Sequence, residues 1–168
     1  STNKREFSSF LNVNKGEKLF GMLLALTSLF LFFSIFSYIT SFKVDQSVAI
    51  EGWDYIKSTE TYKIQNWMNK MGVFVGYFFV DKLFGIMSLL IPIAMFIICF
   101  NFILQKRLFS YIKVLFYPIL YILFGSSLLS FIQLVFTKNV LFAFGGGFGE
   151  IICGRDSFLH QYIGILGI

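Results

Sequence analysis

Three long runs of uncharged residues constrain this chain more than any other feature of its sequence. They comprise 24 residues between Lys18 and Lys43, 23 between Lys82 and Lys106, and 24 between Lys113 and Lys138. A helix that crosses a bilayer needs about 20 mostly apolar residues, because the hydrocarbon layer is about 30 Å thick. Each run meets that requirement. The sequence therefore predicts an all-α integral membrane protein.

The composition excludes several other classes of protein. Of the 168 residues, 57% are hydrophobic and 14% are charged, which leaves no polar segment large enough for a soluble catalytic domain. Cys99 and Cys153 do not form a CxxC pair, which argues against a zinc site, a disulfide scaffold or a thiol relay. The first apolar run is too long for a cleaved signal peptide and is predicted to be a retained anchor.

We predict a short N-terminal segment, residues 1–18, followed by a transmembrane domain, residues 19–168. Its spans are expected at about 19–42, 74–104, 114–136 and 158–168, the last of them truncated at the C-terminus and too short to cross. Pro92 lies in the second span, where it predicts a kink. The polar stretch 43–70 is predicted to be a loop, and the glycine run 145–149 a loop or a short re-entrant hairpin.

The charges that flank the spans predict the orientation, because Lys and Arg near span ends are retained on the cytoplasmic side. The segment before the first span carries four basic residues, and the turn between the second and third spans carries three without an acidic partner. The prediction is a four-helix domain with both termini in the cytoplasm and an extracytoplasmic loop between the first two spans.

Side chains that could carry chemistry are scarce. The central parts of the first three spans contain no ionisable residue, so an ion path or proton relay has little support. The lone His160 has no carboxylate or cysteine neighbour. The run Gly145–Gly149 lacks the Lys and the hydroxyl of a phosphate-binding loop. We therefore predict no catalytic, cofactor-binding or metal-binding residue in this chain.

Two groups of residues are candidates for packing and for contact. Glycines at small-xxx-small spacing or in apolar helices allow close helix packing; the candidates are Gly72, Gly76, Gly85, Gly145, Gly149, Gly164 and Gly167. The candidate partner or interface residues are Asp81, Lys82, Trp53 and Trp67. The Asp81–Lys82 pair marks either an interfacial boundary, which we favour, or a partner contact. The tryptophans belong either to an interfacial aromatic belt or to a contact with a periplasmic protein.

Several stretches, taken in order, resemble the N-terminal four-helix membrane domain of FtsK/SpoIIIE-type DNA translocases, in particular those of Bacteroidota. They are Phe36–Tyr38 with Phe42–Ser47, Asn66–Gly72, Gly76, Leu83–Gly85, Pro92, Gly145–Gly149 and Gln161–Gly167. Asn69 stands where that family usually has a glycine, and Val73 replaces a small residue. No Walker motif is present, so the residues of the family's motor cannot be assigned to this chain.

The resemblance implies a membrane-anchoring and assembly domain of a septal DNA translocase, in the bacterial inner membrane. It would tether a cytoplasmic ATP-driven DNA motor that acts in cell division and chromosome segregation. The expected partners are lipid and either further copies of the chain or other cell-division or envelope membrane proteins, with no direct contact to nucleic acid. Two alternatives stay open: a small non-catalytic subunit of an envelope complex, and a four-helix transporter or membrane enzyme.

Overall fold

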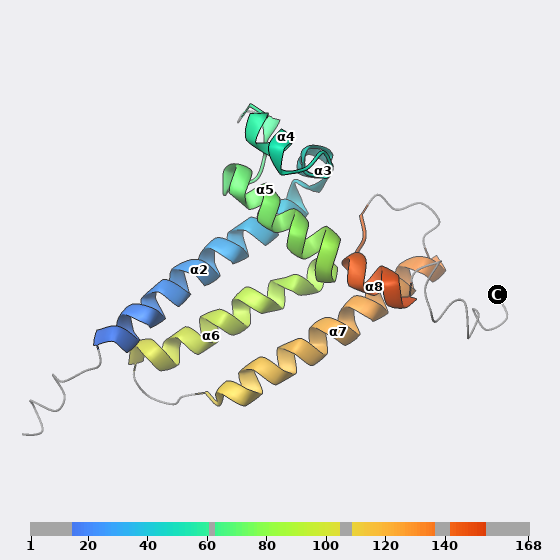
Figure 1. The fold of residues 1–168 in the computed structure, drawn as a ribbon. Coiled ribbons are helices and arrows are strands. Elements are labelled where there is room, and N and C mark those ends of the chain that lie inside the picture. Colours follow the sequence, from blue (N-terminus) through green and yellow to red (C-terminus); the bar gives the residue numbers. More distant parts are fainter. Residues whose placement is uncertain (1–14, 61–62, 105–108, 137–141, 154–168) are drawn as a thin grey trace, which may run out of the picture.

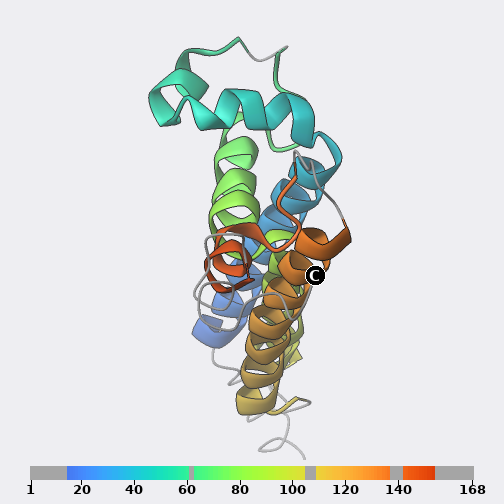
Figure 2. The same cartoon turned by 90° about the vertical axis from the view of Figure 1, so that its right-hand side faces the viewer.

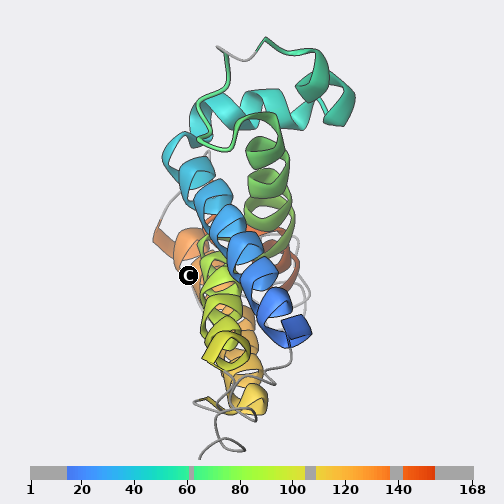
Figure 3. The same cartoon turned by 90° about the vertical axis from the view of Figure 1, so that its left-hand side faces the viewer.

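The computed structural model describes residues 15–60, 63–104, 109–136 and 142–153, and these form helices and turns without strands. Three long helices lie side by side in a bundle (Figure 1). They are α2 (Lys15–Thr40), α6 (Leu90–Leu104) and α7 (Tyr111–Phe136). Two short helices, α3 (Phe42–Ile50) and α4 (Trp53–Ser58), lie across one end of the bundle, called the α3 end below (Figures 2 and 3).

Three stretches are long and apolar enough to cross a membrane. They are Lys15–Thr40, Asn69–Leu104 and Tyr111–Phe136, and 22%, 22% and 17% of their most apolar windows are buried within the protein. The low burial leaves most of their apolar surface for lipid, as expected of spanning helices. All three stretches begin earlier than the predicted spans, and the first ends at Thr40 rather than at residue 42. The predicted fourth span, 158–168, lies outside the described residues.

Helices α2 and α6 run antiparallel and approach each other closely through small residues. A Cβ atom at Gly21 would lie 2.8 Å from the Cβ of Phe102, so only glycine fits there without a shift. The Ser28 hydroxyl donates a hydrogen bond of 2.6 Å to the carbonyl of Pro92 across the interface. Small residues and interhelical hydrogen bonds are the usual means of helix association in lipid, where the hydrophobic effect does not drive it.

The second apolar stretch is broken, and the break is not where the sequence predicts it. Helix α5 (Asn69–Tyr77) continues into the π-helical segment η2 (Phe78–Phe84), and the 3-10 segment η3 (Gly85–Leu89) then leads into α6. The chain turns at Gly85, whose φ is +64°. The chain breaks at Gly85 instead of at Pro92, which lies in the first turn of α6, where proline is tolerated.

The predicted loop 43–70 contains two short helices, α3 and α4, which the sequence analysis did not predict. Helix α3 buries Phe42, Val48 and Ala49, which recur on one face at helical spacing. With Ile35 and Tyr38 of α2, these residues belong to the main buried cluster of the described chain. The core of this protein therefore lies at the α3 end rather than between the long helices.

The glycine-rich run also differs from its prediction. It begins helix α8 (Gly146–Cys153), which packs against η2 and α7 near the C-terminal end of α7 (Figure 1). The prediction of a loop or a re-entrant hairpin did not include this helix, since four glycines within five residues have low helix propensity and tertiary contacts must supply the stability instead.

Candidate functional site

Several glycines lie in close contact where the broken second stretch meets the segment that leads into α8. We call this place the glycine junction and define it by Gly85, Gly145, Gly146 and Gly149. All four glycines are buried. Gly85 and Gly146 both have φ of +64°, a conformation that side chains with a Cβ atom rarely adopt.

Gly85 is in direct backbone contact with the segment before α8. A Cβ atom at this position would lie 2.0 Å from the carbonyl oxygen of Phe144. That carbonyl accepts a hydrogen bond of 3.0 Å from the backbone N–H of Ile86. The break in the second stretch thus exposes a backbone donor, and a segment nearly 60 residues later along the chain (142–145) satisfies it.

The other side of the junction contacts two serines of α7, Ser126 and Ser130. The Ser126 hydroxyl donates a hydrogen bond of 2.5 Å to the carbonyl of Gly145. A Cβ atom at Gly145 would lie 2.2 Å from the carbonyl oxygen of Ser126, and one at Gly149 would lie 2.3 Å from the Ser130 Oγ. The serines and the glycines together bring the α8 backbone against the α7 backbone.

Gln133 of α7 fixes the segment that precedes the junction. Its amide nitrogen donates to the carbonyl of Phe142, and its amide oxygen accepts from the N–H of Phe144, both at 2.9 Å. A single side chain thereby satisfies two backbone groups of a non-helical segment. Such a segment is tolerated next to lipid only where protein groups replace the missing water.

A buried tyrosine joins α2 to η2 beside the junction. The Tyr38 side chain is fully buried, and its hydroxyl donates a hydrogen bond of 2.5 Å to a carboxylate oxygen of Asp81. A Cβ atom at Gly76 would lie 2.3 Å from the Cβ of Tyr38, so α5 crosses α2 directly over this tyrosine. The ammonium group of Lys82 lies 5.3 Å from the centre of the Tyr77 ring. Both charged residues of the pair thus have partners within the chain.

Polar groups of α2 also hold the chain that enters α5. The amide nitrogen of Asn66 donates to the carbonyl of Ser34 at 3.0 Å, and its amide oxygen accepts from the N–H of Met68 at the same distance. The Ser37 hydroxyl accepts from the N–H of Trp67 at 2.9 Å. These contacts set the start of α5 against α2.

We expect Asn66→Ala to lower the free energy of unfolding by about 1–3 kcal/mol, because the Asn66 side chain is buried and its removal leaves backbone groups without partners. Unfolding with SDS in mixed micelles, followed by circular dichroism, measures the change. Ser58→Ala is the control, since its hydroxyl bonds only to the carbonyl of Tyr55 on the exposed surface of α4. Equal stability of the two variants would contradict the assigned role of Asn66.

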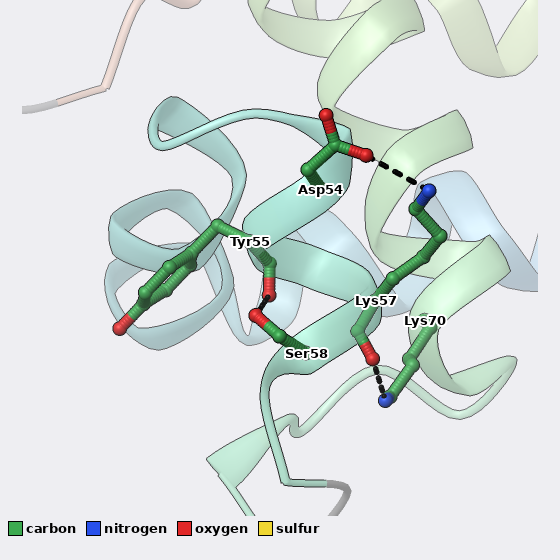
Figure 4. A network of polar contacts seen from close by, with 5 residues as sticks. All are labelled: Asp54, Tyr55, Lys57, Ser58 and Lys70. Carbon is green, nitrogen blue, oxygen red and sulfur yellow. Dashed lines mark hydrogen bonds and ion pairs between the residues drawn. The ribbon is translucent and has the colours of Figure 1, made fainter.

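A second polar network lies on α4, at the α3 end (Figure 4). Asp54 and Lys57 form an ion pair of 2.8 Å within the helix, and Lys70 of α5 donates a hydrogen bond of 2.6 Å to the carbonyl of Lys57. The hydrogen bond and the positive charge from Lys57 hold the pKa of the Asp54 carboxyl below its ordinary value. Asp54 is fully exposed, so this network orders the surface of α4 rather than its core.

The Asp54 carboxyl is expected to titrate below its ordinary range, and Lys57→Gln is expected to return its pKa toward the ordinary value. Because the pKa is lowered in the folded state, the ion pair stabilises the fold at pH values above the ordinary aspartate pKa. This stabilisation is lost as the pH falls through the folded-state pKa. NMR titration of the carboxyl carbon measures the shift. Lys63→Gln, which removes a different exposed pair with Glu60, is expected to leave Asp54 unchanged.

The arrangement of these groups is suited to packing. Among the described residues, no group of three or more His, Cys, Asp or Glu side chains could hold a metal ion. The close contacts join backbone to backbone through glycine and serine. They make the broken stretch, α8 and α7 one interlocked unit.

Comparison with known proteins identifies the family of the chain. Residues 14–168 match the family described as the 4TM region of DNA translocase FtsK/SpoIIIE. The chain belongs to this family. No curated protein and no solved structure shows significant similarity to it.

In this member of the FtsK/SpoIIIE 4TM family, five of the seven candidate packing glycines lie in contacts too close for a Cβ atom. They are Gly72, Gly76, Gly85, Gly145 and Gly149. The other two, Gly164 and Gly167, lie outside the described residues. The glycine junction unites three of the five, while Gly72 and Gly76 lie farther along α5, against Asn66 and Tyr38.

The four candidate contact residues of the 4TM region lie in two separate places. The ring centroids of Trp53 and Phe74 lie 4.9 Å apart, and those of Trp67 and Phe36 lie 5.9 Å apart. The Lys82 ammonium group lies 5.3 Å from the centroid of the Tyr77 ring. Asp81 is engaged by Tyr38. The two tryptophans therefore lie on the α3 end, and the charged pair lies beside the glycine junction.

The sequence analysis missed several residues that build this site, namely Tyr38, Ser126, Ser130, Gln133 and Gly146. A signal was present for two of them, because Ser126 and Ser130 have the same small-xxx-small spacing as the glycines. The roles of Tyr38 and Gln133 depend on partners 43 and 9 to 11 residues away, and no spacing rule reveals such contacts.

Proposed function

We propose that this chain is the membrane-anchoring and assembly domain of an FtsK/SpoIIIE-type DNA translocase. In this proposal it tethers a cytoplasmic ATP-driven DNA motor that acts in cell division and chromosome segregation. It performs no catalysis, binds no cofactor and does not contact DNA itself. The observation that carries the proposal is the match of residues 14–168 to the 4TM region of that family.

The proposed orientation places the N-terminus in the cytoplasm and the α3 end outside, in the inner membrane of a bacterium. Basic residues support this orientation. Lys15 and Lys18 begin α2, and Lys113 lies in the first turn of α7, all at the end of the bundle opposite α3. Lysines near span ends are retained in the cytoplasm. At the α3 end, Lys57 and Lys63 are each paired with an acidic residue, Asp54 and Glu60.

Single-cysteine labelling tests the orientation. In a background with Cys99→Ser and Cys153→Ser, we expect a membrane-impermeant maleimide to label Ser58→Cys in intact spheroplasts. Ser110→Cys, in the segment just before α7, is expected to react only after lysis. Labelling of Ser110→Cys in intact spheroplasts would reverse the proposed topology.

The intact mass of the native polypeptide, isolated from its membrane, tests the anchoring role. A mass several times 19.4 kDa is expected, because the proposed motor is carried by the same chain. A fluorescent fusion of this domain is expected to concentrate at the division septum. A native mass near 19.4 kDa would instead favour a small subunit of an envelope complex.

For assembly, we propose self-association or contact with other cell-division membrane proteins. The lipid-facing helix α7 supports this proposal, since its side chains expose large apolar surface along its whole length. Phe116, Tyr121 and Phe124 are 56%, 65% and 73% exposed. Cross-linking in native membranes, followed by mass analysis, tests it; recovery of the monomer alone would contradict it.

A further inference from the structure

An open groove lies at the α3 end, between the α2–α3 connection and the segment that Gln133 holds. Its volume is about 510 Å³, in the range typical of ligand pockets. Figure 2 shows the segment that leads into α8 beside the end of α2. The side chains that matter for its chemistry are Ile39, Phe42, Lys43, Ile86, Phe142 and Phe144.

Six of the ten residues that line the groove are apolar, and the polar ones are Thr40, Ser41, Lys43 and Gln65. The rings of Phe42 and Phe142 meet edge to face, with centroids 4.3 Å apart. The backbone of the 142–144 segment is bound by Gln133 from one side and by the N–H of Ile86 from the other. A groove with this backbone support keeps its shape without an occupant, as preformed ligand sites do.

The position of the groove along the membrane normal matches that of a lipid headgroup. Ile39 follows Lys18 by 21 residues on the continuous helix α2. A helix of that length rises about 30 Å, which is the thickness of the hydrocarbon layer. With Lys18 at one membrane surface, Ile39 and the groove lie at the other.

One cation on the rim has no counter-charge within the described part of the chain. Lys43 is exposed and forms no ion pair there, whereas Lys57 and Lys63 of the same end pair with Asp54 and Glu60. The nearby Asp45 carboxylate is buried and already accepts hydrogen bonds from the Ser41 hydroxyl and from the N–H of Gln65. Helix α3 also begins at Phe42, so the positive end of its dipole lies at the same rim.

We propose that this groove binds one anionic phospholipid of the membrane leaflet at the α3 end. An acyl chain lies between the side chains of Ile39, Ile86 and the phenylalanines, and the headgroup phosphate contacts the Lys43 ammonium group. The charge of Lys43 selects an anionic headgroup over a zwitterionic one of the same chain length. The bound lipid would join the α2–α3 corner to the glycine junction.

Native mass spectrometry of the full chain in detergent, titrated with dioleoyl phosphatidylglycerol or dioleoyl phosphatidylcholine, tests the proposal. The unmodified chain is expected to retain one phosphatidylglycerol and to bind it more tightly than phosphatidylcholine. Lys43→Gln is expected to weaken phosphatidylglycerol binding about fivefold, the contribution of one lysine near an anionic lipid. Val44→Trp fills the groove from an exposed position and is expected to abolish retention of both lipids.

Lys63→Gln is the matched control, because it removes a lysine of the same end that does not line the groove. It is expected to bind as the unmodified chain does. Loss of binding in both lysine variants, with Val44→Trp unaffected, would indicate surface attraction without a site. Loss in Val44→Trp alone would show an apolar groove without headgroup selection. A second copy retained in place of lipid would likewise overturn the proposal.

Discussion

Gly85→Ala is expected to destabilise the protein by about 3–5 kcal/mol, combining the strain of a left-handed backbone with forced overpacking. The φ of +64° is unfavourable for alanine, and the new methyl group would lie 2.0 Å from the Phe144 carbonyl oxygen. That oxygen is a backbone atom bound to the N–H of Ile86, so it cannot rotate away as a side chain would. SDS unfolding in mixed micelles measures the loss.

Gly52→Ala separates the two causes of this loss. Gly52 has φ of +94°, yet no atom would lie within 4 Å of its added Cβ. Its substitution is therefore expected to cost only about 1–3 kcal/mol of backbone strain. If Gly85→Ala and Gly52→Ala were equally destabilised, the contact between Gly85 and the segment before α8 would contribute nothing to the fold.

Gly146→Ala is expected to release α8 from the bundle while α2 and α6 stay packed. Three backbone atoms would lie too close to the new Cβ: the N of Gly85 at 2.4 Å, the O of Val80 at 2.5 Å and the O of Leu83 at 2.6 Å. All three belong to the π-helical segment and its break. Since the positive φ adds strain as well, the local docking of α8 is lost before the long helices separate.

The modification rates of the two cysteines distinguish this local release from global unfolding. Cys153 ends α8 and is partly exposed, whereas Cys99 is buried in α6. In Gly146→Ala, the rate of Cys153 modification by N-ethylmaleimide is expected to rise about tenfold or more, the factor that 1.4 kcal/mol produces. The rate at Cys99 is expected to stay unchanged. A parallel rise at both cysteines would show global unfolding instead, and no rise at either would contradict the docking role of Gly146.

These two glycines connect the stability of the domain to its proposed role. A membrane anchor for a motor has to transmit force without separating its helices. The glycine junction ties α7 and α8 to the broken stretch, and Tyr38 ties that stretch to α2. Loss of either glycine is therefore expected to weaken anchoring through the fold, without a change in any catalytic group.

Much of the bundle was predictable from the sequence because lipid imposes a simple rule. An uncharged run of about 20 residues must form a helix that satisfies its own backbone, so the runs after Lys18, Lys82 and Lys113 locate three helices. The ends of the helices were less accurate, since Lys15 and Asn69 are tolerated at helix ends near the surface. This rule does not apply to the polar stretch 43–70, whose helices α3 and α4 depend on the packing of their buried side chains.

The candidate site was predictable only in its residue types. Glycine spacing indicates that helices approach closely at Gly76 or Gly149, but it does not name the opposing residue. The opposing residues are Tyr38 and Ser130, which lie on other helices. Similarly, the Asp81–Lys82 pair signals an unusual position in an apolar stretch, while its partner Tyr38 is 43 residues away.

The sequence by itself determined that this chain is helical, that it lies in a membrane, and which family it resembles. Those properties follow from local composition and from the order of short motifs along the chain. Tertiary structure alone decided that the second stretch breaks at Gly85 rather than at Pro92. The reason is physical: a broken helix leaves backbone groups unpaired, and only the distant segment around Phe144, held by Gln133, supplies the partner that makes the break stable.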